Sequence, residues 1–250
     1  MMQELGQYIY GIVAAQNDAG LDIEGIVPEE DVKIICHDGI GVIVSPSPVK
    51  KYEINRKNTL AHQRVMEKAM GTFPLLPVRF GTIAKSENEI REKVLEKRCR
   101  EFKENLEYIK DKNEVGLKAL WKDKDQVFQE IISENKRIRQ LKDRLNSQKG
   151  GQHRDRIRLG DMVVKALESK KEKKGKMMLN RFDGLFAEHK RNKLMGDQMI
   201  LNSVFLVLKT REENFDRAVA KLDQEYGERI KIKYIGPVPP CNFIELTISI

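Results

Sequence analysis

Long apolar runs and a leader-like N-terminus are both missing from this sequence of 250 residues. No stretch approaches the roughly 18 consecutive apolar residues that a membrane-spanning helix requires. The first residues also lack the basic region followed by an apolar region that forms a signal peptide. We therefore expect a cytoplasmic protein that does not bind a membrane.

Cysteines are few, and the usual signatures of catalysis are missing as well. Cys36, Cys99 and Cys241 are odd in number and far apart, which predicts reduced thiols and offers no ligand pairs for zinc. No phosphate-binding loop, metal-ligand cluster or nucleophile–base pair is readable in the sequence. We expect a protein that is not an enzyme and that holds no cofactor and no metal.

Apolar residues make up 40% of the sequence and charged residues 34%, which supports packed cores. Strand-like and helix-like segments predict an α+β fold with two domains, residues 1–110 and 111–250. In the first domain we expect a mixed or antiparallel sheet with helices on one face, and a Ser-Pro-Ser-Pro segment at 45–48 that ends the third strand. Its predicted elements are strands at 7–14, 32–35, 40–44 and 74–83, and helices at 58–70 and 86–110.

The second domain is predicted to follow a ferredoxin-like order of elements, with its first helix expanded into a helical hairpin at about 123–193. Ile131 and Ile138 are seven residues apart in the first arm, which favours a partly coiled-coil hairpin. Gly150 and Gly151 join the two arms. The other predicted elements are strands at 115–121, 201–208, 230–234 and 244–250, and a helix at 211–226.

The short apolar block at 74–83 is the first candidate site. Leu76, Val78 and Phe80 share one face of the predicted strand, and Pro77 favours an edge position. Arg79 within such a block needs a partner, because a buried unpaired charge is costly. It either forms an ion pair that ties the strand to a neighbouring helix or binds an anion or a partner protein.

His62 lies beside the apolar stripe of the predicted helix at 58–70. It could act as a catalytic base, but no nucleophile or carboxylate near it in sequence completes a constellation. We therefore favour a packed, hydrogen-bonded histidine.

The region 136–193 carries nineteen Lys or Arg residues against seven Asp or Glu residues, a net charge of +12, and the rest of the chain sums to −4. A basic helical arm could follow a phosphate backbone, which makes an RNA-binding or ribosome-associated protein the alternative function. The run from Lys170 to Lys176 has no interleaved aromatic residues for base stacking, so we do not expect nucleic acid as the partner.

Three blocks of the sequence together resemble the gas vesicle protein F/L family: residues 8–11, then His62 with residues 77–82, then residues 234–243. The resemblance spans essentially the whole chain, and Cys241 stands where the family often has an aromatic residue. The family-like positions are Tyr10, Gly11, His62, Pro77, Arg79, Phe80, Gly81, Thr82, Gly236, Pro237, Pro239, Pro240, Asn242 and Phe243.

The resemblance implies a non-enzymatic accessory protein of gas vesicle assembly, located at the gas vesicle. Its expected partners are the small hydrophobic shell protein and other gas vesicle proteins. An open sheet edge or an apolar groove could shield the shell protein's apolar segments. Two surfaces are candidates, and we slightly favour the first. They are the edge with Leu76, Val78, Arg79 and Phe80, and the last predicted strand with Ile244, Leu246, Ile248 and Ile250.

Overall fold

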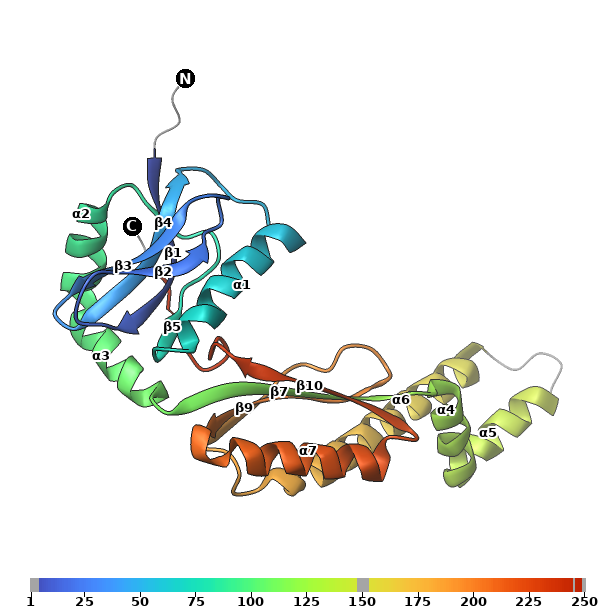
Figure 1. Cartoon of the computed structure of the whole chain (residues 1–250). Coiled ribbons are helices and arrows are strands. Elements are labelled where there is room, and N and C mark those ends of the chain that lie inside the picture. The colour runs from blue at the N-terminus through green and yellow to red at the C-terminus, as the bar shows by residue number, and fades with distance from the viewer. Residues whose placement is uncertain (1–4, 148–152, 245, 249–250) are drawn as a thin grey trace. The chain divides into compact units, whose positions relative to one another are not determined.

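The computed structural model describes residues 5–147, 153–244 and 246–248 of the chain (Figure 1). The chain divides into two compact units, of which unit 1 comprises Met1–Glu114 and Pro237–Ile250 and unit 2 comprises Val115–Gly236. Residues 237–250 therefore belong to unit 1, whereas the sequence suggested that they belong to the second domain. The physical reason is that Ile244 and Leu246 are buried in a core of unit 1.

Unit 1 is built on one antiparallel sheet, in which β1 is central and β5 and β2 lie at the two edges. Strand order is β2-β3-β4-β1-β5, and β6 also pairs with β1. The strands are β1 (Leu5–Ala14), β2 (Ala19–Glu24), β3 (Asp31–His37), β4 (Ile40–Pro48), β5 (Leu75–Pro77) and β6 (Ile83–Ala84).

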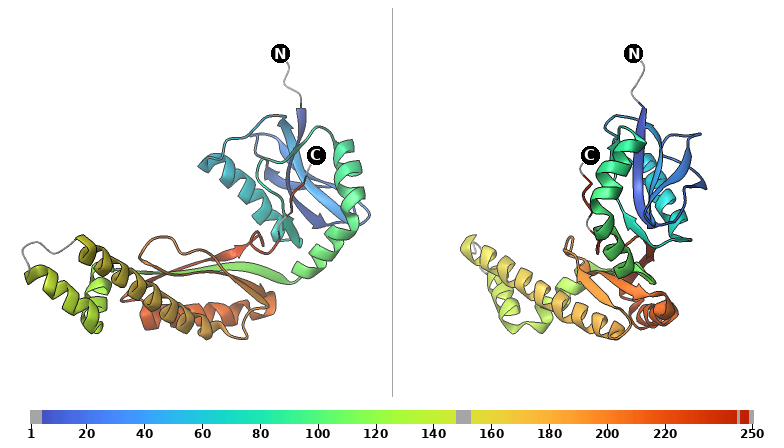
Figure 2. Two further views of the ribbon diagram at one scale, coloured as in Figure 1. Left: turned by 180° about the vertical axis from the view of Figure 1, so that it is seen from behind. Right: turned by 90° about the vertical axis from the view of Figure 1, so that its left-hand side faces the viewer.

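Helices cover both faces of this sheet, not one face as the sequence suggested (Figures 1 and 2). Val65 of the first helix packs with Tyr8 and Tyr10 on one face, whereas Phe102 of the last helix packs with Ile9 on the other. Both faces carry apolar residues, so each requires a cover. The helices are α1 (Arg56–Met70), α2 (Glu87–Glu89), the π-helical turn η1 (Ile90–Glu96) and α3 (Lys97–Ile109).

A β-bulge in β1 sets which side chains reach which face. The register with β4 shifts between Ile9 and Gly11, so the in–out alternation slips by one residue at this point. Gly11 also allows β5 to approach closely, because a Cβ there would lie 2.7 Å from Leu75 Cδ1 and 3.0 Å from the Leu76 carbonyl oxygen. The bulge therefore places Val13 with Tyr8 and Tyr10 on the face that α1 covers, and it places Ile12 with Ile9 on the other face.

In unit 1 the predicted end of the third strand was wrong, and one strand was missed. The strand β4 continues through Pro46 to Pro48, because β3 pairs with β4 only as far as Val44 and the prolines then lie on an open edge. The strand β2, whose residues alternate between exposed and half-buried, was not predicted at all.

Unit 2 has the element order strand, helices, strand, strand, helix, strand, and its sheet order is β10-β7-β9-β8. This is the arrangement of a split β-α-β motif. Helices α6 and α7 lie on the same face of the sheet (Figures 1 and 2). The elements are β7 (Lys112–Trp121), α4 (Lys124–Glu134), α5 (Lys136–Ser147), α6 (His153–Leu179), η2 (Asn180–Phe182), β8 (Glu188–Arg191), β9 (Met199–Leu208), η3 (Lys209–Arg211), α7 (Glu212–Tyr226) and β10 (Ile230–Val238).

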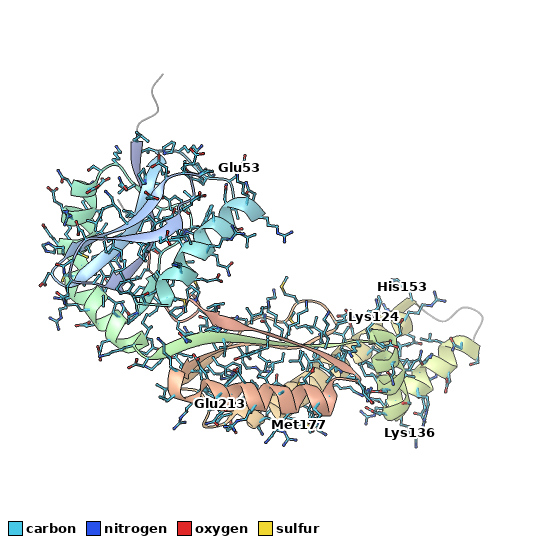
Figure 3. The ribbon with its side chains drawn as sticks, viewed as in Figure 1. Glu53, Lys124, Lys136, His153, Met177 and Glu213 are labelled. Atoms are coloured by element: carbon cyan, nitrogen blue, oxygen red, sulfur yellow. The ribbon has the colours of Figure 1, made fainter. Side chains whose placement is uncertain are left out.

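The α+β fold with antiparallel strands is confirmed, but several details of the second half differ from the prediction. The first helical arm breaks at Asn135, whose side chain caps α5 by accepting the backbone N–H of Arg137 at 3.2 Å. The strand β8 lies inside the segment that was expected to be helical. The Gly150-Gly151 junction lies outside the described residues. Figure 3 marks Lys136 and His153, the first residues of α5 and α6.

The predicted strand at 244–250 does not form in the part of it that the structure describes, residues 244 and 246–248. The backbone N–H of Ile244 bonds to the Pro240 carbonyl at 2.9 Å, so the chain turns before it reaches the alternating residues. Ile244 and Leu246 then use their apolar side chains to fill a core and not to line a sheet. Ile250 lies outside the described residues.

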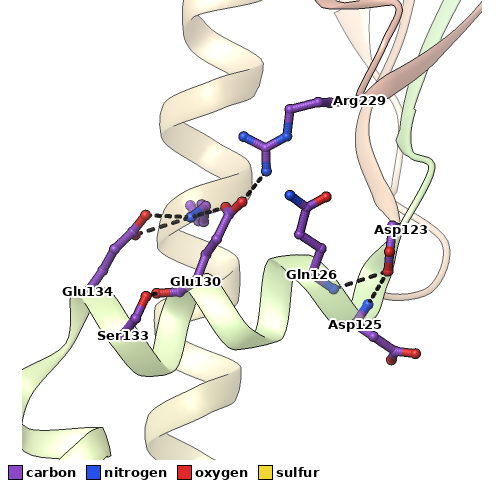
Figure 4. A network of polar contacts seen from close by, with 8 residues as sticks. Asp123, Asp125, Gln126, Glu130, Ser133, Glu134 and Arg229 are labelled. Atoms are coloured by element: carbon purple, nitrogen blue, oxygen red, sulfur yellow. Dashed lines mark hydrogen bonds and ion pairs between the residues drawn. The ribbon is translucent and has the colours of Figure 1, made fainter.

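Ion pairs join α4 to α6 and to the start of β10 (Figure 4). Lys170 Nζ lies 2.9 Å from Glu130 Oε2 and 3.0 Å from Glu134 Oε1, and Arg229 also pairs with Glu130. The Asp123 side chain caps α4 by accepting the backbone N–H groups of Asp125 and Gln126. Lys170 of the basic run therefore has acidic partners inside unit 2.

We expect Glu130→Gln to lower the free energy of unfolding by about 1 kcal/mol, because it weakens two partly buried pairs together. Burial alone raises the pKa of Glu130, but pairing with Lys170 and Arg229 outweighs this and lowers it. The control is Glu213→Gln, since Glu213 lies on the surface 3.9 Å from Arg217 and should contribute almost nothing. Urea titrations of the three proteins test this, and equal midpoints would contradict it.

Candidate functional site

The loop at residues 78–82 brings the family-like positions of unit 1 together. It follows β5 and is fixed to β1 at both ends: Val78 N–H donates to the Tyr10 carbonyl at 3.1 Å, and Ile9 N–H donates to the Thr82 carbonyl at 2.9 Å. Pro77, just before the loop, is paired with Gly11 in the sheet. The loop is therefore a rigid extension of the sheet.

A buried pair of side chains, Tyr8 and His62, holds the middle of the loop. The hydroxyl oxygen of Tyr8 accepts the backbone N–H of Gly81 at 2.9 Å and lies 3.1 Å from His62 Nδ1. Because that oxygen already accepts a hydrogen bond, we assign the Tyr8 hydroxyl as the donor to His62 Nδ1. The hydrogen of the neutral imidazole is then on Nε2. His62 also hydrogen-bonds the backbone of Val78, so one pair of side chains grips two points of the loop.

Burial keeps this pair uncharged. His62 is 5% exposed, and burial lowers its pKa to about 4 despite the hydrogen bond to Val78. Burial likewise raises the pKa of Tyr8 well above its ordinary value, and it raises the pKa of Tyr10 to about 12. Neither Tyr8 nor His62 carries a charge at neutral pH or meets solvent, so their geometry suits positioning and not proton exchange with a substrate.

Aromatic rings complete the support of the loop. Tyr10 stacks on His62 with ring centroids 5.6 Å apart, and Phe80 meets His62 edge-on at 5.6 Å. Phe80 was predicted to share a face with Leu76 and Val78, and that prediction is wrong. The strand ends at Pro77, so the two-residue alternation does not continue and Phe80 turns to the side of His62.

Residues 237–243 of the third block join the same unit through a buried carboxylate that was not expected from the sequence. Glu114 is 2% exposed and accepts hydrogen bonds from the Asn242 backbone N–H at 2.8 Å and from its side-chain amide at 2.5 Å. The sequence carried no signal for this contact, because alternation in β7 places Glu114 on the face opposite to the buried Val115 and Leu117.

The proline-rich part of that block begins exposed in a strand and ends buried. Gly236 and Pro237 lie in β10, while Pro239 and Pro240 are buried. A turn follows, in which Phe243 N–H donates to the Pro240 carbonyl at 3.1 Å. The block therefore returns the chain to unit 1, and Gly236 itself belongs to unit 2.

Most apolar residues of the two surfaces expected to meet a partner are internal, whereas Phe80 and Ile248 are half-buried. Leu76 is fully buried, Val78 is 3% exposed, and Ile244 and Leu246 are each 6% exposed, all within one core. Ile248 packs against the same core. The two candidate surfaces thus cover each other.

Arg79 is exposed and stands between two depressions on unit 1. The larger is a groove of about 1010 Å³, and the smaller, of about 300 Å³, is lined by Val78, Ile244 and Leu246 among others. Of the two alternatives for Arg79, the ion pair is not formed with any carboxylate of the described residues. The residues lining the groove are Lys51, Tyr52, Glu53, Ile54, Thr59, Arg79, Phe80, Gly81, Thr82, Ile83, Thr247 and Ile248.

The described part of the chain contains no group of three or more His, Cys, Asp or Glu side chains that could hold a metal ion. Within the same residues, no helix is both long enough and apolar enough to cross a bilayer.

The buried, neutral His62 makes stability depend on pH. In the unfolded chain His62 binds a proton below about pH 6.5, but in the folded site it does so only near pH 4. The stability of this site is therefore complete above pH 6.5 and falls as the pH drops towards 4, by about 3 kcal/mol in total. We expect His62→Gln to be less stable at neutral pH and to lose less stability on acidification. Parallel pH profiles of unfolding free energy for the two proteins would contradict this.

Gly81 has a φ of +83°, where a side chain is strained even though a Cβ would meet no atom within 4 Å. We expect Gly81→Ala to cost about 1 kcal/mol of unfolding free energy. Gly20→Ala is the control, because that position is equally open and does not have a positive φ. Thermal unfolding should show a lower midpoint for the first variant alone. A Gly81→Ala midpoint as high as that of the Gly20→Ala variant would show that the loop tolerates another conformation.

Comparisons with known proteins agree over the whole chain. The family model described as gas vesicle synthesis protein GvpL/GvpF matches residues 6–245. Gas vesicle protein F of Microcystis aeruginosa is 26% identical over 244 residues, which cover 97% of this chain and 99% of the relative. Gas vesicle protein F of Dolichospermum flosaquae is 25% identical over 241 residues, which cover 96% of this chain and 97% of the relative. The crystal structure of GvpF from Anabaena sp. superposes with a TM-score of 0.86 at 25% identity. The match covers 97% of this chain and 99% of the crystallised chain. The chain belongs to the GvpL/GvpF family of gas vesicle synthesis proteins.

Proposed function

We propose that this chain is a non-enzymatic accessory protein of gas vesicle formation that binds the small hydrophobic shell protein. It works in the cytoplasm at the vesicle, together with other gas vesicle proteins. The observation that carries the proposal is that the family-like positions of β1 and α1 converge beneath the 78–82 loop of unit 1 and hold it in place. The names of the relatives support the link to gas vesicles.

The docking surface in this proposal is the groove beside the 78–82 loop. A shell subunit carries apolar segments that aggregate until they are assembled, so a partner must cover them. The groove offers Tyr52, Phe80 and Ile83, and Ile54 is 84% exposed at its wall. Figure 3 labels Glu53, the neighbour of Ile54 in the segment before α1. The groove keeps Arg79, Phe80 and Ile248 of the two surfaces expected from the sequence. It leaves out the other apolar residues of those surfaces, which are already covered: Leu76, Val78, Ile244 and Leu246.

We also propose that unit 2 is a ferredoxin-like domain in which α4, α5 and α6 form the expanded first helix. The RNA-binding alternative has little support from this unit. Lys171 is 3% exposed and pairs with Glu168 at 2.9 Å, and Lys174 lies 4.1 Å above the ring of Tyr226. Lysines that are engaged in this way are not free to follow a phosphate backbone.

The test is substitution of an exposed groove residue. We expect Ile54→Asp to reduce co-purification of the shell protein at least tenfold, because a charge in an apolar groove must be desolvated on binding. Its stability should not change, since Ile54 is exposed. Leu5→Asp is the matched control, because Leu5 is 69% exposed in the same unit and does not line the groove.

Two results would count against the proposal. If the wild-type chain does not retain the shell protein when the two are expressed together, shell-protein binding is wrong. If Ile54→Asp and Leu5→Asp retain it equally well, the groove is not the docking surface. Val78→Asp is unsuitable here, because a charge at a residue that is 3% exposed would unfold unit 1.

A further inference from the structure

Arg79 has no acidic partner among the described residues, unlike Arg91 and Arg98 of the same unit. Arg91 pairs with Asp18 at 3.0 Å, and Arg98 pairs with Glu101 at 2.6 Å. Arg79 instead is exposed on the rim shared by the two depressions. A guanidinium group that has no intramolecular partner keeps all five N–H donors available.

The backbone at Arg79 is held on each side. Thr82 Oγ1 donates to the Arg79 carbonyl at 2.8 Å, and Val78 N–H and Gly81 N–H are bonded to β1 residues. Buried Tyr8 supplies the acceptor for Gly81. Because the chain is already ordered, an incoming group has only the arginine side chain to immobilise.

The surroundings of Arg79 define the chemistry of the group that it would meet. Among the described residues, the larger groove is lined by apolar side chains, three threonines, one other cation, Lys51, and one anion, Glu53. Arg79 is the single charged residue of the described lining of the smaller depression, which includes Val78, Ile244 and Leu246. The described lining is thus mainly apolar with a net positive charge, which complements an apolar segment that carries a carboxylate.

We infer that Arg79 is the specificity-determining residue of the docking groove and forms a bidentate ion pair with an Asp or Glu side chain of the shell protein. The inference rests on the proposed function, and it adds the chemical group that the site selects. Apolar contacts in the groove are non-directional, so they would accept many apolar segments. The planar guanidinium accepts a carboxylate in one orientation and fixes which segment binds and in which register.

The experiment measures the binding of overlapping synthetic peptides that cover the shell protein, by fluorescence anisotropy with the full-length chain. For the peptide that the wild-type chain binds best, we expect Arg79→Glu and Arg79→Gln each to weaken binding at least tenfold. Arg79→Lys should weaken it severalfold, because an ammonium group cannot form the bidentate pair. Arg64→Glu is the control, since Arg64 is exposed on α1, has no ion pair among the described residues and does not line the groove.

A charge exchange provides the decisive arm. Replacing the paired carboxylate of the peptide by arginine should abolish binding to the wild-type chain and restore binding to Arg79→Glu. If no peptide and no intact shell protein binds the wild-type chain, the proposed function fails and this inference fails with it. If the wild-type chain binds and Arg79→Glu and Arg79→Gln bind equally well, the inference alone is overturned and the groove remains the docking surface.

Discussion

The hydrogen bond between Tyr8 and His62 is the constraint on which the surface of unit 1 depends. The two residues are 54 positions apart and come from β1 and α1. Through them a helix on one face of the sheet fixes a loop at its edge. The arrangement is stable because both groups stay neutral in a buried site, where a charged histidine would be costly. An exposed loop thereby gains the order of a core.

This constraint explains the division of roles among the family-like positions. Gly11 lets β5 approach β1, Pro77 ends the strand, and Gly81 turns the loop with a positive φ. Tyr10 and His62 support the loop from beneath. Arg79 alone projects into solvent without a partner among the described residues. Most of these positions are therefore structural, and they hold in place Arg79, the residue for which we propose a role in binding.

The sequence predicted the parts of the fold that rest on local pattern. Strand β7 alternates as expected, and α7 occupies the segment that helical spacing indicated. The errors share one physical cause, which is that long-range packing overrides local signals. An unpaired edge tolerates the prolines of β4, and β8 is a strand of four polar residues that β9 completes. No spacing rule could reveal the hydrogen bond between Tyr8 and His62 or the hydrogen bonds that Glu114 accepts from Asn242.

The interruption of unit 1 by unit 2 affects how the protein is made. A ribosome releases Met1–Glu114 first, then all of Val115–Gly236, and only then the residues that complete unit 1. Until that point Glu114 lacks the two hydrogen bonds from Asn242, and the core beside Val78 lacks Ile244 and Leu246. The nascent chain thus lacks the finished surface beside the 78–82 loop until residues 237–246 have been made. Under the proposed function, this order of the chain disfavours early engagement of an aggregation-prone partner on the ribosome.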